Sequence, residues 1–117
     1  MINIYDTANQ LASDFQETDQ FKKLAEAINQ VKANETSLKL YQEMESFQKT
    51  IMAKTQAGQD LDENEKAKYQ ELNKKIGEDE NVQAVIKAEQ GLYVLLDDVQ
   101  KTIAKPITDL YKEISIG

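Results

Sequence analysis

The sequence contains no cysteine and no histidine. Without cysteine the chain cannot form disulfides, zinc ribbons or iron–sulfur clusters, and no thiol can act as a nucleophile. Without histidine it lacks the usual general base at neutral pH, any Ser-His-Asp arrangement and the Glu-x-x-His pairs of di-iron bundles. We therefore predict no catalytic residue, no cofactor and no bound metal.

Arginine is also absent, so all 14 basic residues are lysines, and the net charge at pH 7 is −7. A nucleic-acid site normally needs a basic stripe, with arginine favoured for bidentate contacts to phosphate and guanine. The three Phe and five Tyr lie in apolar stripes rather than among the lysines. We expect a solvated acidic surface and no direct binding of DNA or RNA.

Long hydrophobic runs are lacking as well. The longest, residues 92–96, has five apolar residues, far fewer than the ~20 that a membrane-spanning helix needs. The N-terminus has no basic segment followed by an apolar one, so it does not resemble a signal peptide. We expect a cytoplasmic protein that does not insert into membranes.

Glycine and proline are scarce, with four and one residues respectively. The segments between them are rich in Ala, Leu, Lys, Glu and Gln, which favour helices, and their apolar residues recur every three or four positions. The sequence predicts one all-α domain over residues 1–117, a five-helix bundle with a projecting hairpin and a short helical tail after Pro106. The predicted stripes are Ile4, Ala8, Leu11, Phe15; Phe21, Leu24, Ala25, Ile28, Val31; Leu40, Met44, Phe47, Ile51; Tyr69, Leu72, Ile76; Val82, Val85, Ile86, Leu92, Tyr93, Leu96, Val99, Ile103; and, in the tail, Ile107, Leu110, Tyr111, Ile114.

Capping and stop residues mark the helix boundaries. Asn34 can cap the third helix, Gly58 can stop it, and Asp62 with Glu65 has the spacing of a capping box. Pro106 cannot donate a backbone hydrogen bond, so it either kinks the last long helix or ends it. The tail beyond Pro106 can be stable only if it docks against something.

Residues 52–76 are predicted to project as an exposed acidic hairpin. Residues 58–81 carry eight acids and four lysines, and the apolar stripe there is thin. An acidic surface can steer a basic partner. The surface around Leu61, Asp62 and Tyr69 is therefore a candidate partner site.

Residues 60–71 within this hairpin follow part of the EF-hand pattern for calcium. Carboxylate or amide side chains occupy its first, third, fifth and twelfth positions. The sixth position requires glycine and holds Glu65, and the ninth holds Lys68. We interpret these acids as helix-capping residues rather than as metal ligands.

The apolar turn Leu92–Leu96 provides a second candidate surface. Leu92 belongs to the core stripe, whereas Leu95 lies at its edge and Val94 points roughly opposite. Gly91, next to them, would let another backbone approach closely. We interpret Leu92, Val94 and Leu95 as a self-association or partner interface; the alternative is a second contact inside the monomer.

A minor alternative is a metal-dependent hydrolase that uses carboxylates alone. Glu89 falls within the apolar stripe, and Asp79-Glu80 and Asp97-Asp98 form acid pairs. However, no carboxylate has a histidine or arginine partner, and no glycine-rich loop could cradle a phosphate. Glu89 is better explained by a position at a helix edge or by pairing with a lysine.

Four segments carry a resemblance to a known family: "IYDTANQLASDF", "TDQFKKLAEAINQV", "LKLYQEMESFQ" and "AEQGLYVLLDDVQKTIAKPI". Over essentially its whole length the chain resembles the YlbF/YmcA-like family of small helical proteins from Gram-positive bacteria, and its YheA-like branch most closely. The shared residues are helix-packing patterns. The resemblance implies an all-helical protein that associates with itself or with family relatives. Small bundles often bury a remaining apolar surface by dimerising, so a dimer is the form that we expect.

The resemblance also implies a function. Some relatives are regulatory accessory proteins in competence, sporulation and biofilm formation, in a complex that associates with a membrane-anchored ribonuclease and affects RNA processing. Certain relatives carry cysteines linked to an iron–sulfur cluster, which this sequence lacks. Our first hypothesis is a non-enzymatic helical adaptor that acts through protein–protein contacts, and the alternative is an accessory factor of such a ribonuclease-associated complex.

Overall fold

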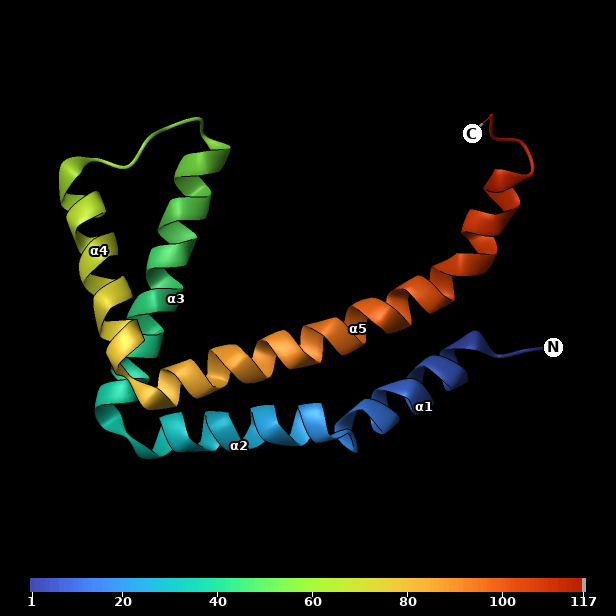
Figure 1. Cartoon of the computed structure of the whole chain (residues 1–117), viewed down its shortest axis with the longest axis horizontal. Coiled ribbons are helices and arrows are strands. Elements are labelled where there is room, and N and C mark those ends of the chain that lie inside the picture. The colour runs from blue at the N-terminus through green and yellow to red at the C-terminus, as the bar shows by residue number, and fades with distance from the viewer. Residues whose placement is uncertain (117) are drawn as a thin grey trace.

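The computed structural model describes residues 1–116 and confirms the all-α prediction. Its five helices are α1 (Ile4–Gln16), α2 (Asp19–Ala33), α3 (Glu35–Gln56), α4 (Glu63–Glu78) and α5 (Glu80–Lys112), and residues 1–116 contain no strand. α2 and the first half of α5 lie side by side, and α3 and α4 form a hairpin that projects from one end of this pair (Figure 1). α1 and the last turns of α5 extend from the other end, where both termini lie.

The predicted helix boundaries are largely confirmed. The Asn34 side chain accepts a hydrogen bond from the Ser37 amide at the start of α3, and Asp62 and Glu65 form the capping box of α4. Gly58 has a φ of 70°, the left-handed conformation that glycine adopts at low cost after a helix. α4 continues past Gly77 to Glu78, and Asp79 is both the C-cap of α4 and the N-cap of α5.

Pro106 lies inside α5 and does not end it. The predicted tail is therefore the continuation of a 33-residue helix rather than a separate element. Proline removes one donor from the helical ladder and pushes against the preceding turn, which bends a helix without necessarily breaking it. Figure 1 shows α5 curving away from α1 over its last turns.

The core lies where the hairpin meets the α2–α5 pair. One cluster, around Phe47, Leu72 and Val82, joins α3, α4 and α5. A second, around Val31 and Val85, joins α2 and α5. Tyr41 packs against both clusters, so the two are continuous.

A buried polar network fixes the same junction. The Ser37 side chain, 1% exposed, donates its hydroxyl to the Asp79 carboxylate at 3.0 and 2.8 Å. Asp79 also accepts the Val82 amide at 2.9 Å and so caps α5, while the Asn81 amide donates to the Ser37 oxygen at 3.2 Å. The first turn of α3 is thereby tied to the first turn of α5.

The molecule is unusually open for its length. Its radius of gyration is 19.6 Å, whereas a compact domain of this length has about 13 Å. Its accessible surface is 9520 Å², against about 6,400 Å² for a folded monomer of this mass. Roughly a third of the surface is thus exposed beyond what a closed monomer would show.

Candidate interaction surface

Two helical segments leave the core and lie apart from each other. We call α1 and residues 97–112 of α5 the two arms. No residue of α1 is buried. On the α5 arm, the large apolar side chains from Ile103 onward are all more than half exposed. The large exposed apolar side chains at this end are Met1, Ile2, Ile4, Tyr5, Ile103, Ile107, Leu110, Tyr111, Ile114 and Ile116.

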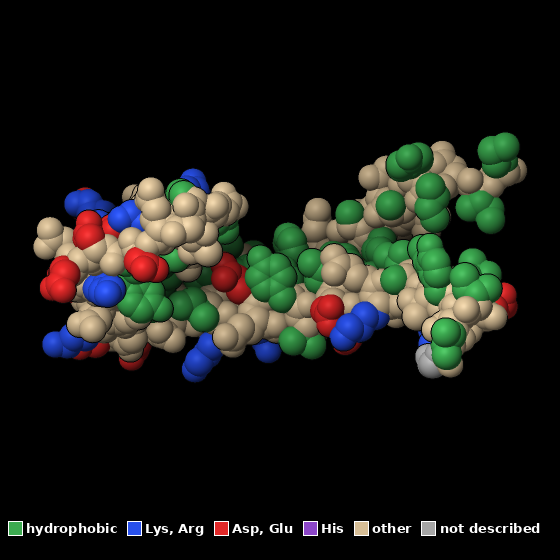
Figure 2. All heavy atoms as spheres, turned by 90° about the horizontal axis from the view of Figure 1, so that it is seen from above, with side chains coloured by type: hydrophobic (Ala, Val, Ile, Leu, Met, Phe, Trp, Pro, Cys, Tyr) green, Lys and Arg blue, Asp and Glu red, His purple; other side chains and the backbone are tan. Residues whose placement is uncertain are grey.

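The arms differ from the rest of the surface in chemistry as well. Figure 2 shows hydrophobic side chains gathered on both arms, whereas charged side chains crowd the opposite end of the molecule. α1 has two acids and no lysine, and residues 97–112 have three acids and three lysines. The lysines of this segment pair with acids of the same helix, as in Lys101–Asp97 at 2.8 Å and Lys105–Asp109 at 2.7 Å. Because these charged side chains are paired, the exposed apolar stripe is the main part of the arms that has no partner in the described chain.

The predicted residues of the apolar turn have unlike environments. Leu92 and Leu95 are half-buried, so for Leu95 the contact within the monomer accounts for much of its surface. Val94 is 64% exposed and remains available to a partner. Gly91 is exposed, and a side-chain carbon added there would meet no atom within 4 Å.

The predicted hairpin residues serve mainly to hold the hairpin together. Asp62 caps α4, and Leu61 is half-buried. Tyr69 packs beside Phe47 with ring centroids 6.1 Å apart, yet it stays 46% exposed. Lys54 of α3 forms an ion pair with Glu65 of α4 across the hairpin, and the lowered pKa of Glu65 is caused first by this hydrogen bond and then by one from the Asp62 amide.

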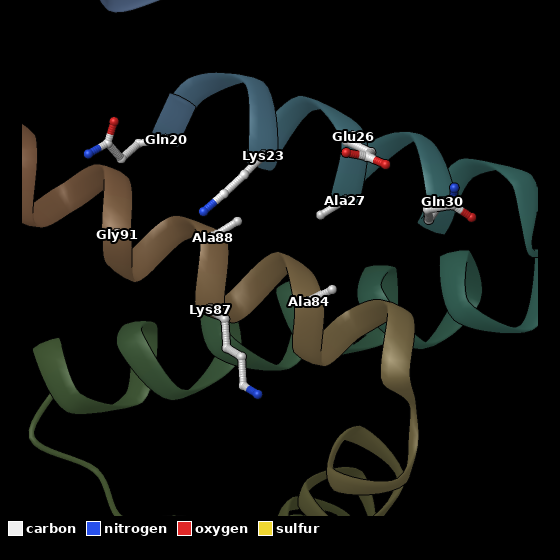
Figure 3. A pocket seen from close by; sticks show the side chains of 9 residues that line it. All are labelled: Gln20, Lys23, Glu26, Ala27, Gln30, Ala84, Lys87, Ala88 and Gly91. Carbon is white, nitrogen blue, oxygen red and sulfur yellow. The ribbon is translucent and has the colours of Figure 1, made fainter. Parts of the chain in front are cut away.

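A shallow groove of about 540 Å³ runs between α2 and α5. Its floor is made of small residues, and Figure 3 shows Ala27, Ala84 and Ala88 in the space between the two helices. Lys23 reaches from α2 toward α5, whereas Lys87 points away. No set of polar groups converges in the groove, so its geometry does not define a ligand.

The acids considered for a hydrolase have structural roles or stand apart. Asp79 caps α5, and Asp97 pairs with Lys101. Glu89 is half-buried. It lies near Tyr41, whose pKa is raised first by the burial of Tyr41 itself and then by the negative charges of Glu89 and Glu45. Within residues 1–116, no three acidic side chains are grouped so that they could hold a metal ion.

The two arms are the surface that sequence reasoning missed. The stripes of α1 and of the tail were predicted to be buried faces, and the tail was expected to need docking. The structure leaves the face of the tail exposed and covers the face of α1 only in part, at Leu11 and Phe15. None of the helices within residues 1–116 is both long and hydrophobic enough to cross a membrane.

Comparison with known proteins places this helical fold in a family of helical proteins. Residues 4–108 match the family described as "Control of competence regulator ComK, YlbF/YmcA". The chain belongs to this family, which confirms the resemblance inferred from its sequence.

Similar proteins cover nearly the whole chain. A UPF0342 protein of Lactobacillus delbrueckii subsp. bulgaricus is 44% identical over 97% of both chains, and one of Staphylococcus aureus strain Newman is 35% identical over 96% of this chain and 98% of its own. A solved structure, "Protein of Unknown Function (DUF964) from Bacillus stearothermophilus", superimposes with a TM-score of 0.81 at 20% identity, covering 96% of this chain and 98% of the other. At this identity the likeness establishes a shared fold.

Proposed function

We propose that this protein is a non-enzymatic cytoplasmic adaptor that self-associates, as a dimer in the simplest case, and regulates other proteins by binding them. The observation that carries the proposal is the pair of apolar arms. Monomeric soluble proteins rarely expose contiguous apolar patches larger than a few hundred Å², and larger patches mark interaction sites. A chain that leaves such surface uncovered is suited to binding proteins.

The two ends of the molecule suit two kinds of contact. The arms are apolar, as in stable subunit interfaces. The hairpin end is charged and keeps Tyr69 and Met52 partly exposed, as in interfaces whose association is steered by charge. An adaptor needs both: one surface for its own assembly and another for its partner.

Family membership favours a more specific role. The family description concerns control of a competence regulator, and we extend a regulatory role of this kind to the present chain. In this second proposal the protein is an accessory factor of a ribonuclease-associated complex. Because the chain lacks cysteine, it would act there without an iron–sulfur cluster of its own.

Affinity purification of the tagged protein from its native host at low salt, with identification of the partners by mass spectrometry, tests the proposal. Recovery of ribonuclease or family relatives supports the accessory role. Recovery of other proteins that dissociate as salt increases supports an adaptor of a different process, because charge steering weakens with ionic strength. Recovery of the chain alone contradicts the adaptor role.

A further inference from the structure

We infer that the two arms bind the two arms of a second copy of this chain, so that the dimer interface lies at the end of the molecule opposite the hairpin. This inference rests on the self-association proposed above and specifies its surface. It differs from the interface at Leu92, Val94 and Leu95 that the sequence suggests. Four helical segments, two from each copy, would surround the contact.

The first argument comes from α1. This helix has 13 residues and buries none of them, and isolated helices shorter than about 12–15 residues are marginal in water. Helices in proteins gain most of their stability by packing an apolar face. α1 has such a face in Ile4, Ala8, Leu11 and Phe15, and its own chain covers only Leu11 and Phe15 in part, so the first half of the helix requires a partner that the single chain does not supply.

The second argument comes from area. The accessible surface of 9520 Å² exceeds that of an average monomer of this mass by roughly 3,000 Å². Obligate dimer interfaces bury about 2,000–5,000 Å² in total, half of it on each copy. On each chain, a dimer interface of this size would therefore bury a third or more of the accessible surface that exceeds the area of an average monomer.

The third argument identifies the occupant as another copy. In a two-fold dimer the same patch meets itself, so a patch with strong charge of one sign would repel its counterpart. The α5 arm carries equal numbers of acids and lysines, already paired along the helix in Lys101–Asp97 and Lys105–Asp109. Residues 58–81, with eight acids against four lysines, carry much of the chain's surplus negative charge, and they lie away from the arms. The α5 arm can therefore meet its counterpart without marked repulsion, and α1 adds only two acids, Asp6 and Asp14, to the apolar surface.

The arms do not cover each other within one chain. They diverge from the α2–α5 pair in Figure 1, and Figure 2 shows hydrophobic side chains exposed on both. A second copy related by two-fold symmetry would place its own pair of arms against this open end. One such contact would cover both arms of both copies.

The test compares lysine substitutions at four apolar positions with nearly equal exposure. Ile4 and Leu110 on the arms are both 64% exposed, Val94 in the middle of α5 is 64% exposed, and Met52 on the hairpin is 62% exposed. Because each side chain is mostly exposed, no substitution removes a core residue from the single chain. Light scattering after size-exclusion chromatography measures the mass of each variant.

We expect the wild type to have twice the 13.3 kDa mass of one chain, and Ile4→Lys and Leu110→Lys to have the mass of one chain. Met52→Lys should remain a dimer, and Val94→Lys should too. A wild-type dimer that only Val94→Lys or Met52→Lys dissociates would overturn the assignment of the surface while leaving self-association intact. A wild type with the mass of one chain would overturn self-association itself.

Hydrogen exchange of the wild-type protein provides a readout that needs no variant. Uncovered arms would exchange their amide hydrogens rapidly, because short unpacked helices open often. We expect α1 and residues 97–112 to be protected in a particle of two chains. Rapid exchange in both arms, or protection in a particle of one chain, would contradict the inference.

Discussion

The two ends of this molecule differ in how far their apolar side chains are buried. At the hairpin end, α3, α4 and α5 share a core around Phe47 and Val82, and the buried Ser37–Asp79 hydrogen bonds fix how the helices meet. At the arm end, α1 buries nothing and the apolar residues of α5 from Ile103 onward are exposed. The first end buries its apolar residues within one chain, whereas the second leaves them exposed, and we propose that a partner covers them.

This difference in burial does not come from the helical pattern of the sequence. Both ends have apolar stripes with helical spacing, and both have well-formed caps, such as Asn3 at the start of α1 and Asp62 at the start of α4. What differs is the number of helices that meet. Three helices converge on Phe47 and enclose it, while the two arms diverge.

The largest effect should follow from a substitution in the core of the closed end. Phe47 is 6% exposed, and replacing a buried Phe by Ala costs about 3–5 kcal/mol of unfolding free energy. We expect Phe47→Ala to lower stability by about this amount in urea denaturation. Its matched variant, Tyr111→Ala on the arm, removes a 67% exposed aromatic ring.

Tyr111→Ala should cost less than about 0.5 kcal/mol in a single chain, as exposed substitutions do. In the dimer its effect should depend on protein concentration, because subunit binding and folding are then linked. Phe47→Ala should show its loss at every concentration. Equal effects of the two substitutions at low concentration would remove the distinction between a closed and an open end.

An intermediate effect is expected for the polar network at the junction. Ser37→Ala removes the hydroxyl that donates to Asp79 and accepts from Asn81. The two partners are left incompletely bonded, which costs about 1–3 kcal/mol when polar groups are buried. Thr36→Ala removes an exposed hydroxyl from the same turn of α3 and should change stability by less than about 0.5 kcal/mol. Similar small losses from both variants in urea denaturation would show that the network does not hold the junction.

The elements of the fold could be predicted because they depend on local sequence. Asn34, Gly58 and the Asp62–Glu65 box act on backbone groups within four residues of themselves, so their spacing alone identifies them. The Ser37–Asp79 contact could not be predicted, since its partners lie 42 positions apart. The course of α5 past Pro106 was likewise open, because a proline permits either a bend or an end.

The candidate surface was harder to predict for a related reason. An apolar stripe predicts that one face of a helix is buried, but it does not predict which helix or which partner covers that face. Leu72 is covered by its own chain and Leu110 is not, although the stripes around them look alike in sequence. Val94 breaks the periodicity, so the sequence marks it as exposed, whereas the stripes of the arms fit the periodicity and have the pattern of buried faces.

The smallest effect is expected for the ion pair that closes the hairpin, where Lys54 holds Glu65. The hydrogen bond from Lys54 is the largest cause that lowers the pKa of Glu65 below its ordinary value of 4.5. A carboxyl whose pKa is lower in the folded state stabilises the fold above its unfolded pKa, and this contribution disappears as the pH falls through the folded pKa.

Lys54→Met should therefore reduce stability slightly at neutral pH and make stability less sensitive to acid below about pH 4.5. Urea denaturation of the wild type and the variant from pH 7 to pH 3 measures this, and the two curves should converge as the pH falls. Lys75→Met provides the control, because Lys75 pairs with Glu71 within α4 alone and both side chains are more than half exposed. Exposed pairs of this kind contribute little, so its curve should run parallel to that of the wild type. If the gap between Lys54→Met and the wild type stayed constant down to pH 3, Lys54 would be acting through the packing of its aliphatic chain, and the closed end would depend on burial even where its charges meet.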